Sequence, residues 1–394
     1  MSDPVHPLGP CSVAEFLSRY WQRRPLLIRG AFPGFDSPLS PEELAGLALE
    51  DGVASRLILE RGKHPWELRH APHEPGTFEA LPESHWTLLV HEVDQWIPGV
   101  GRLLDGFRFL PNWRLDDVMV SYAAPHGSVG AHLDHYDVFL LQGRGRRRWS
   151  IEKTPRPAGE ATVPGLDVRM LAEFDPDEEW VLEPGDMLYL PPRIPHHGVA
   201  VDACMTYSIG FRAPHQKELA AAFGADLTER ADPGLRYADP DLKPGVAPGE
   251  IDASTLARIR ATLERLDQDE EALAAWFGRF ATEPKRERAE PEGEPEWSAE
   301  RLRAAFGSSG FRLQRAAPGR FAHYRHGDGE VSLFVGGEAY RLSEESSAFA
   351  ALLTGGAILD GTTLAGYLAN EELLRWIARW IHHGFLFVED GTAR

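Results

Sequence analysis

Cysteine is scarce in this chain, with only Cys11 and Cys204 among 394 residues. This scarcity excludes a disulfide framework and a cysteine-rich zinc module. Long apolar runs are also missing, since none reaches the ~18 residues that a membrane span needs. The first ten residues, MSDPVHPLGP, lack the apolar core of a signal peptide. We therefore expect a cytosolic protein without membrane association.

Positive charge is in short supply as well. The 41 Lys and Arg residues face 60 Asp and Glu residues, so the net charge is −19. This balance disfavours a generic binder of duplex nucleic acid, whose phosphates attract clustered cations, and it favours a basic partner. The hydrophobic fraction of 43% is ordinary for a globular protein. At roughly 150 residues per domain, the length predicts two or three domains.

Residues 1–212 are expected to form one domain that consists mainly of β-strands. Ser12 is a plausible N-cap for a short helix, which precedes a strand in the segment LLIRG. Short runs rich in Val, Tyr, Phe and Leu then alternate with Gly, Pro and Asp, which is typical of an antiparallel barrel or a double-sheet jelly roll. The expected strands in this part are 118–123, 136–143, 146–152, 180–184, 186–192 and 204–212.

Residues 213–282 change to a helical period. Leu256, Ile259, Leu263 and Leu266 form one apolar stripe, which must be buried against this chain or another copy. We expect a helical dimerisation region here. Residues 283–296 contain three prolines and nine charged residues but no large apolar side chain, so they are predicted to be a linker.

Residues 297–394 predict a small α+β domain. Alternating apolar positions flank a Gly-Asp-Gly turn at 327–329, which is a hairpin signal, and helices surround it. The pattern suggests a winged-helix-like domain. The helix expected at 369–383 has Arg375 and Arg379, but the residues before it are acidic, so binding of nucleic acid is not expected. A role in packing or in docking a protein partner is the simpler interpretation.

The strongest chemical signal is the sequence His132-Leu133-Asp134. In a strand, residues i and i+2 project from the same face, so one imidazole and one carboxylate would point together. A Pro-Gly-Asp turn, a strand and a proline-rich approach lead to His196 and His197, either of which can supply a third ligand. Two histidines and one carboxylate form the facial triad of non-haem Fe(II) oxygenases. An isolated His-x-Asp is usually a simple polar pair, and His135 has the wrong parity to join it.

An oxygenase of this type needs a co-substrate, most commonly 2-oxoglutarate, whose far carboxylate requires a cation. Arg147 follows His132 by 15 residues, after a turn through Gly143, Arg144 and Gly145 that is expected to bring the next strand back beside the first. A guanidinium can bind a carboxylate through two hydrogen bonds. Parity separates Arg147 from its arginine neighbours. Ser121, at the end of another strand, is a weaker candidate for the same carboxylate.

Asp117 and Met119 share the parity of Ser121, so all three are expected on one face of a strand. A carboxylate inside an apolar barrel requires a cationic partner. Tyr136 has the parity of Asp134 and can add a flat wall, so the set describes a pocket for an arginine or lysine side chain. The alternative is an ordinary salt bridge from Asp117 to one of three nearby arginines, namely Arg102, Arg108 and Arg114.

Several longer phrases resemble the bacterial JmjC-type ribosomal oxygenases, which are arginine hydroxylases of the large-subunit ribosomal protein L-sixteen. The phrases are PLLIRGAFP, HLDHYDVFLLQGRGRRRW, YLPPRIPHHG and YSIGFRAP, and the likeness continues through RYADPDLKP and WFGRFATEPK. The resemblance implies a double-stranded β-helix of the cupin type, a helical dimerisation region and a C-terminal winged helix. It also implies Fe(II), 2-oxoglutarate and O2 as cofactors, with hydroxylation at C3, the β-carbon, of one arginine.

The resemblance also assigns roles to individual residues. It implies that His132, Asp134 and His196 bind iron and that Ser121 and Arg147 bind 2-oxoglutarate. It further implies an arginine pocket lined by Asp117, Met119, Tyr136 and Ser208. His197 stands where the family is expected to have an acid, which leaves the third ligand less secure. Two other functions stay open: the same chemistry on a histidine, a lysine or RNA, and a non-catalytic metal-binding regulator.

Overall fold

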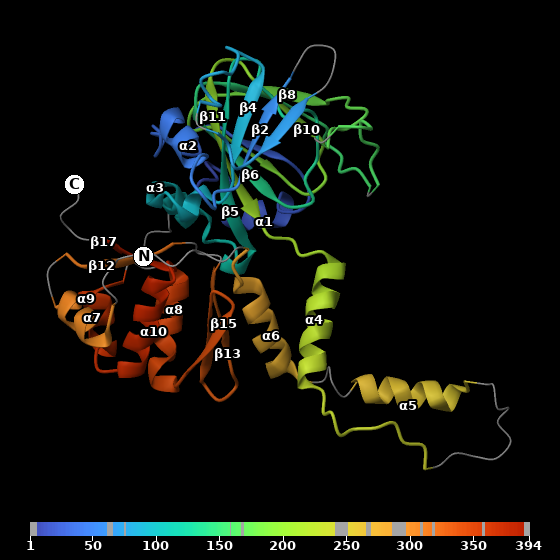
Figure 1. The fold of residues 1–394 in the computed structure, drawn as a ribbon, viewed down its shortest axis with the longest axis vertical. Coiled ribbons are helices and arrows are strands. Elements are labelled where there is room, and N and C mark those ends of the chain that lie inside the picture. The colour runs from blue at the N-terminus through green and yellow to red at the C-terminus, as the bar shows by residue number, and fades with distance from the viewer. Residues whose placement is uncertain are drawn as a thin grey trace. The chain divides into compact units, whose positions relative to one another are not determined.

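The computed structural model describes eleven stretches of the chain (Figure 1). These are residues 6–60, 66–74, 76–157, 159–166, 169–240, 251–264, 269–285, 297–307, 310–316, 320–356 and 359–389. The chain divides into two compact units. Unit 1 consists of residues 1–213, 286–319 and 352–394, and unit 2 of residues 214–285 and 320–351. The domain boundaries expected from composition stay predictions, and residues 286–296 of the expected linker lie outside the described residues.

Two antiparallel sheets form the N-terminal part of unit 1, as the strand-rich segment predicts. The large sheet has the order β1-β9-β6-β11-β5-β4-β2-β3, and the small sheet has the order β10-β7-β8. The strands are β1 Leu26–Ile28, β2 Ser55–Leu59, β3 Glu67–His70, β4 Trp86–Val90, β5 Leu115–Ala123, β6 Val138–Arg144, β7 Arg147–Ile151, β8 Glu178–Leu182, β9 Met187–Leu190, β10 His196–Ala200 and β11 Cys204–Phe211. The short helices are α1 Val13–Arg19, α2 Pro41–Leu47, η1 Val93–Gln95, α3 Pro98–Gly101, η2 Arg102–Phe107 and η3 Asn112–Arg114.

The large sheet is covered on both faces. Its outer face packs against the N-terminal helices, where the ring of Phe16 lies 4.9 Å from that of Tyr189. Ser12 caps α1 by accepting a hydrogen bond from the Glu15 N–H at 3.2 Å, as the sequence predicts. The inner face packs Leu140 and other apolar side chains against Trp149 of the small sheet. Strands buried on both faces have nearly continuous apolar sequences, which explains the composition of β6, β9 and β11.

The connection from β6 to β7 differs from the sequence prediction. These strands do not pair with each other: β6 pairs with β11 and β9, whereas β7 pairs with β10 and β8. Gly145 lies where the chain passes from the large sheet to the small sheet. It has a φ of +59°, and an added Cβ would lie 2.2 Å from the Ala203 carbonyl oxygen, so this passage requires glycine. The prediction was wrong because a turn signal identifies the bend but not the sheet that receives the next strand. As a result, Arg147 faces the large sheet from across the interior.

The C-terminal part of unit 1 combines helices with a small antiparallel sheet of order β16-β12-β17. Its elements are α7 Ala299–Phe306, β12 Arg312–Arg315, β16 Leu359–Asp360, α9 Gly361–Leu364, η6 Ala365–Tyr367, α10 Glu371–His382 and β17 Leu386–Glu389. Asn370 caps α10 by accepting a hydrogen bond from the Leu373 N–H. Ile377 and Trp380 bury the apolar side of that helix. The helical stretch and the final strand that the sequence predicts here are confirmed.

Unit 2 contains helices and a second small sheet of order β13-β14-β15. Its elements are α4 Gln216–Arg230, α5 Ala253–Glu264, α6 Glu270–Thr282, β13 Phe321–Arg325, β14 Val331–Val335, β15 Glu338–Leu342, η5 Glu344–Ser346 and the start of α8 Ser347–Gly355. The hairpin predicted around Gly-Asp-Gly is formed by β13 and β14. Gly278 of α6 lies so close to the Phe334 ring that no larger residue fits. None of the described helices in either unit is long and apolar enough to cross a membrane.

Candidate functional site

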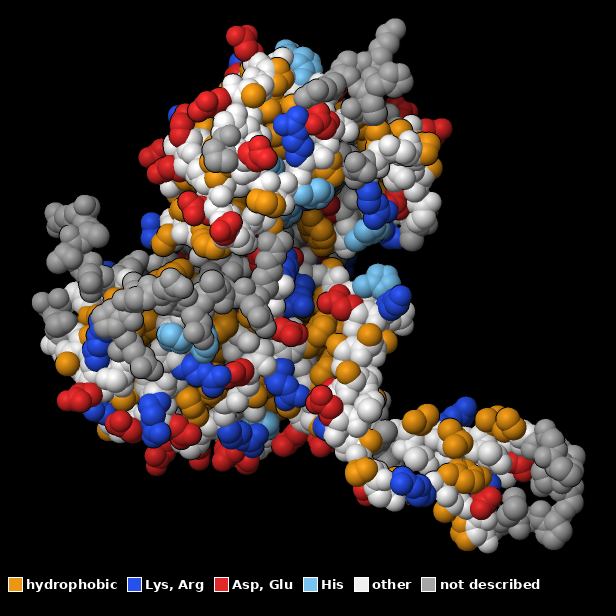
Figure 2. Space-filling view, in the orientation of Figure 1, with side chains coloured by type: hydrophobic (Ala, Val, Ile, Leu, Met, Phe, Trp, Pro, Cys, Tyr) orange, Lys and Arg blue, Asp and Glu red, His pale blue; other side chains and the backbone are white. Residues whose placement is uncertain are grey.

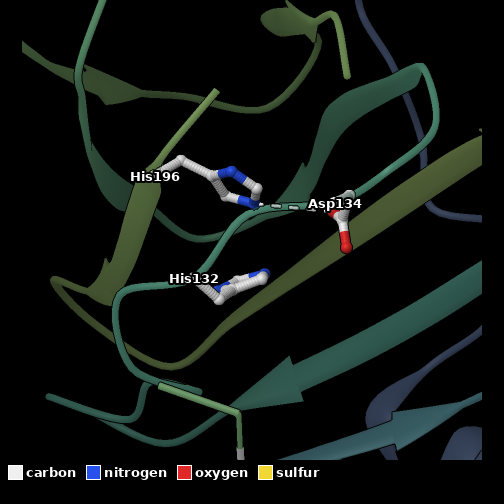
Figure 3. Close-up of side chains that lie close together, drawn as sticks. All are labelled: His132, Asp134 and His196. Atoms are coloured by element: carbon white, nitrogen blue, oxygen red, sulfur yellow. Dashed lines mark ion pairs between the residues drawn. The ribbon is translucent and has the colours of Figure 1, made fainter. Parts of the chain in front are cut away.

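Two histidines and one aspartate converge between the two sheets (Figure 3). His132 and Asp134 come from the segment that precedes β6, and His196 is the first residue of β10. Their ligand atoms all lie within 4.8 Å of one another. The two imidazole centroids are 4.2 Å apart, and His196 Nε2 is 3.7 Å from Asp134 Oδ2. No other such group of three His, Cys, Asp or Glu side chains occurs among the described residues.

A single β-bridge brings these distant segments together. The His132 N–H donates to the His196 carbonyl oxygen at 3.0 Å, and the reverse hydrogen bond measures 2.8 Å. Residues directly opposite each other in an antiparallel pair project to the same side. The prediction that His132 and Asp134 share a regular strand is wrong, because β6 begins only at Val138 and Asp134 lies in a loop. The Asp134 carbonyl oxygen accepts a hydrogen bond from the Arg193 N–H, which holds that loop beside β10.

The local hydrogen bonds leave the inner nitrogen of both imidazoles available. His132 Nδ1 lies 2.9 Å from the Gly130 carbonyl oxygen, and His196 Nδ1 lies 2.9 Å from that of Ile194. A carbonyl oxygen can only accept, so each Nδ1 donates and Nε2 keeps its lone pair in the neutral ring. Burial, followed by the charge of His132, lowers the pKa of His196 to about 4. Two Nε2 atoms and a carboxylate oxygen therefore fit a divalent metal ion.

The other histidines near the cluster point elsewhere. His197, left open by the sequence, directs Nε2 to the Ser128 hydroxyl at 3.0 Å and stays outside the three-residue cluster. His135 is exposed and its Nε2 lies 3.9 Å from Glu160 Oε1, consistent with the parity that separates it from His132. The alternation along β10 thus assigns His196 to the interior and turns its neighbour away.

Arg147 is a buried cation on the inner face of the small sheet, with 3% of its surface exposed. Its Nη1 donates to Ser121 Oγ at 3.3 Å, and its Nη2 donates to the Gly198 carbonyl oxygen at 3.2 Å. Among the described residues, no carboxylate lies within ion-pair distance of this guanidinium. Burial lowers the pKa of Arg147, although a guanidinium stays charged. A buried cation without a counter-ion is well suited to bind an anion.

The neighbouring arginines have ordinary surface roles. Arg146 Nε lies 2.8 Å from Asp202 Oδ2, and Arg148 Nε lies 3.3 Å from Glu179 Oε1. Both arginine side chains are about half exposed. The parity argument therefore orients all three consecutive arginines correctly, even though the sheet that receives their strand was predicted wrongly.

Of the four residues expected to line an arginine pocket, three lie on strands of the large sheet, and Tyr136 lies in the loop before β6. On β5, Asp117 and Met119 alternate with core residues, and Ser208 of β11 lies directly opposite Met119. The pKa of the Tyr136 phenol is raised, first by desolvation of its hydroxyl and then by the negative charges of Asp134 and Asp117. Tyr136 therefore lies within electrostatic reach of both the metal cluster and Asp117.

Two of the three alternative salt bridges of Asp117, those to Arg114 and Arg108, are less favoured because these arginines pair with other carboxylates. Arg114 pairs with the fully buried Asp137 at 3.0 Å, and Arg108 pairs with Asp105 at 2.5 Å. One contact of Asp117 is a backbone hydrogen bond, in which the Glu92 N–H donates to its Oδ2 at 3.2 Å. This contact orients the Asp117 carboxylate.

Asp94, in η1, is a buried acid that the sequence analysis does not identify. It is 1% exposed, and its Oδ1 accepts a hydrogen bond from the Val118 N–H at 2.8 Å. Burial, followed by the charge of Asp117, raises the pKa of Asp94 to about 7. Its position depends on the packing of η1 beside β5, which no local sequence pattern predicts.

We expect Asp94→Asn to reduce the loss of stability that the protein shows as the pH rises from about 4 to about 7. The folded state holds the Asp94 proton to about pH 7, whereas the unfolded chain releases it near 3.8, so the free energy of unfolding falls as pH rises between these values. Over this interval, the change in the free energy of unfolding due to Asp94 is on the order of 4 kcal/mol. Urea unfolding at several pH values measures it, and parallel profiles for both proteins would contradict the assignment.

Two protein families and several known proteins are similar to this chain. The JmjC domain family matches residues 102–219, and the ROXA-like winged helix family matches residues 265–387. The ribosomal protein uL16 3-hydroxylase of Escherichia coli strain K12 is 40% identical over 279 residues, which cover 69% of this chain and 72% of that protein. The chain belongs to the JmjC ribosomal oxygenases. The family resemblance inferred from the sequence phrases, the jelly roll and the winged helix are thereby confirmed.

Solved structures of a ribosomal oxygenase agree over nearly the full length. The X-ray structure of E. coli ycfD is 33% identical, covers 96% of this chain and 99% of its own, and gives a TM-score of 0.86. A second structure shows YcfD in complex with cobalt and 2-oxoglutarate, with 33% identity, coverage of 95% and 98%, and a TM-score of 0.82. The JmjC match contains every site residue expected from the sequence, but it begins after Asp94.

Gly198 is a second position in this ribosomal oxygenase that the sequence analysis does not single out. An added Cβ there would lie 2.7 Å from both Arg147 Nε and the Trp149 ring. A glycine inside a strand often marks a close approach of another group, and the phrase His-His-Gly-Val-Ala contained this signal. The identity of the group that approaches required the pairing of β10 with β7, in which Gly198 lies opposite Trp149.

Proposed function

We propose that this chain is an Fe(II)- and 2-oxoglutarate-dependent oxygenase that hydroxylates C3, the β-carbon, of an arginine in ribosomal protein uL16. The observation that supports this most is the joint presence, between the same two sheets, of the His132–Asp134–His196 cluster and the buried Arg147, which has no counter-ion among the residues that the structure describes. A structural metal site needs no buried cation beside it. A co-substrate that chelates the metal and has a second, distant carboxylate needs both the metal site and the buried cation.

In this proposal each residue has a limited task. His132, Asp134 and His196 would hold the iron through two imidazole nitrogens and one carboxylate oxygen, which is the ligand set of non-haem Fe(II) oxygenases. Arg147 and Ser121 hold the far carboxylate of 2-oxoglutarate, for which YcfD with bound cobalt and 2-oxoglutarate is the precedent. With O2, the bound iron and co-substrate supply the oxidation of a C–H bond and release succinate and carbon dioxide.

The arginine substrate is placed by Asp117, Met119, Tyr136 and Ser208. Asp117 supplies the charge that recognises the guanidinium, and Tyr136 and Met119 supply apolar surface beside it. Positioning matters because the reaction must distinguish one carbon of a flexible side chain from the next. The E. coli relative named for 3-hydroxylation of uL16 supports this carbon and this target.

Asp117→Asn is expected to lower kcat/KM for a uL16-derived peptide by at least about thirtyfold, since losing one partner of a buried charge pair costs 2–5 kcal/mol. The amide keeps the shape of the side chain and its acceptor for the Glu92 N–H. Affinities for Mn(II) and 2-oxoglutarate, measured by calorimetry, should stay within about twofold. Asp116→Asn, of opposite parity on the same strand, is the matched control. Equal loss of metal affinity and peptide turnover would contradict the pocket assignment.

Mass spectrometry of ribosomal proteins from cells with and without the gene tests the function directly. We expect uL16 to lose a single oxygen atom on one arginine in the deletion strain, and the gene with His132→Ala should not restore it. A missing oxygen on a histidine, a lysine or RNA would keep the chemistry and change the target. Failure of the protein to bind 2-oxoglutarate would favour the non-catalytic metal-binding regulator.

The substrate is expected to be basic, and the acidic surface supports this. Residues 171–186 contain seven acids and no base, and Glu173, Asp175 and Asp177 are exposed. Such a surface raises the local concentration of a cationic partner. Because ribosomal proteins are substrates inside the cell, we place the enzyme in the cytoplasm. For the C-terminal winged helix we propose a protein-docking role and no binding of nucleic acid.

We also propose that the enzyme is a homodimer joined through its helical region. On α5, Leu256, Ile259 and Leu263 are 57%, 43% and 60% exposed, and Figure 2 shows hydrophobic side chains gathered along that helix. The fourth member of the expected stripe, Leu266, lies outside the described residues. An exposed apolar stripe of this kind favours burial against a second copy.

Sedimentation velocity tests the dimer. We expect the wild-type protein to sediment as a dimer and the double variant Leu256→Asp, Leu263→Asp to sediment as a monomer, because two charges would be buried in the interface. Ala261→Asp, on the opposite side of α5, is the control and should remain dimeric. A monomeric wild-type protein at micromolar concentration would contradict the proposal.

A further inference from the structure

Trp149 presents a buried indole N–H without an acceptor. The residue is 4% exposed, and among the described residues its Nε1 has no hydrogen-bond partner. Nearly all buried polar groups in folded proteins are paired, so an unpaired one requires an explanation. The Nε atom of Arg147 is in the same state, buried and without an acceptor. Two unpaired donors therefore lie on neighbouring side chains of one strand face.

The Trp149 ring lies close to both Arg147 of the proposed anion site and His196 of the proposed metal site. The Arg147 guanidinium carbon is 4.9 Å from its centroid, and the His196 ring centroid is 5.8 Å from it. One aromatic surface thus adjoins both the cation and a metal ligand. A 2-oxoglutarate molecule that chelates the metal and reaches Arg147 must cover the same span.

Gly198 is the reason that the indole can lie there. It is directly opposite Trp149 in the β10–β7 pair, and any Cβ at this position would meet two atoms of the indole ring at 2.7 Å. The same Cβ would be 2.7 Å from Arg147 Nε. Gly198 therefore lets the benzo edge of the indole and the Arg147 Nε lie close against the backbone of β10, while apolar side chains such as Leu140 pack against the same ring.

We propose that Trp149 is a further binding residue for 2-oxoglutarate, whose chain lies against the indole and whose carboxylate oxygen accepts the Nε1 hydrogen bond. The inference rests on the proposed function, because it takes 2-oxoglutarate as the ligand of Arg147. A dicarboxylate offers enough acceptors for Trp149 Nε1 and Arg147 Nε together. A single buried water molecule is the competing occupant of the space beside Nε1.

Calorimetry without O2 and with Mn(II) bound tests the hydrogen bond, using wild-type protein and Trp149→Phe. The phenyl ring keeps an aromatic face for Arg147 and removes only the donor. We expect 2-oxoglutarate affinity to fall about tenfold or more, as for one hydrogen bond to a charged group. Mn(II) affinity should be unchanged. Trp86→Phe is the control, since Trp86 lies on β4 and its indole N–H already donates to the Pro82 carbonyl oxygen, and it should change the affinity less than about twofold.

Nuclear magnetic resonance supplies a second readout. With Zn(II) as a diamagnetic metal and 15N-labelled indole groups, the signal missing in Trp149→Phe identifies the Trp149 N–H, and 2-oxoglutarate should move that signal downfield. Unchanged affinity in Trp149→Phe, or an indole signal that 2-oxoglutarate leaves in place, would overturn the inference while the proposed function stands. A wild-type protein that binds no 2-oxoglutarate would overturn both.

Discussion

His132→Ala and Asp134→Ala are each expected to abolish uL16-dependent succinate production. Either change leaves two protein ligands, and an open two-ligand site does not retain a divalent ion at micromolar concentration. Loss of an outer-shell partner alone typically costs 10–100-fold in metal affinity or activity, so loss of a ligand should cost at least about a hundredfold. Titration with Mn(II) measures the affinity, and detection of succinate by nuclear magnetic resonance measures the turnover.

His197→Ala provides the control for this experiment. His197 is adjacent to His196 but directs its Nε2 to Ser128 Oγ, so its removal should leave Mn(II) affinity within about threefold of the wild-type value. Coupled turnover near the wild-type level in His132→Ala or Asp134→Ala would contradict the ligand assignment. A large loss of metal affinity in His197→Ala, with little loss in His196→Ala, would exchange the third ligand.

Arg147→Met is expected to stabilise the ligand-free protein and, at the same time, to eliminate 2-oxoglutarate binding. The guanidinium is buried beside Ser121 and Gly198 and has no carboxylate partner among the described residues. Replacing buried charge by an apolar side chain of similar length is often stabilising by about 1–4 kcal/mol. The opposite signs of the two effects distinguish a functional cation from a structural one.

Urea unfolding without ligand and calorimetry with 2-oxoglutarate in the presence of Mn(II) measure the two effects of Arg147→Met. Arg148→Met is the control, because Arg148 is half exposed and pairs with Glu179 on the surface. It should change the unfolding free energy by less than about 1 kcal/mol, as expected for a surface ion pair. Retained 2-oxoglutarate binding in Arg147→Met would contradict the co-substrate site. A destabilised Arg147→Met protein would show that the cation has a structural role.

The metal cluster could be predicted in part. Its residue types and the i, i+2 spacing of His132 and Asp134 are visible in the sequence, but the reason given for their convergence, a regular strand, is wrong. They meet because one bridge to His196 fixes the backbone and a loop then places Asp134. The choice between His196 and His197 depended on which face of β10 turns inward, and that face is set by the partner strand β7.

The co-substrate site could also be predicted only in part. Alternation along one strand orients Arg147 inward whichever sheet receives that strand, so parity sufficed for its direction. Ser121 and Gly198 are 26 and 51 residues away from it, and only the crossing from the large to the small sheet brings them to its guanidinium. Asp94 was not predicted at all, because its altered pKa comes from burial beside β5 and from the charge of Asp117.

The sequence by itself determined the strand-rich and helical segments, the inward arginine, the chemistry of a two-histidine, one-carboxylate metal site and the family. The segments, the arginine and the metal chemistry follow from periodicity and residue type, which are properties of neighbouring positions, and the family follows from the resemblance of longer phrases. The tertiary structure decided which histidine completes the cluster and that, within the described part of the chain, Arg147 has no counter-ion and the Trp149 N–H has no acceptor. Those features depend on contacts between distant segments and on the exclusion of water, which no local pattern specifies.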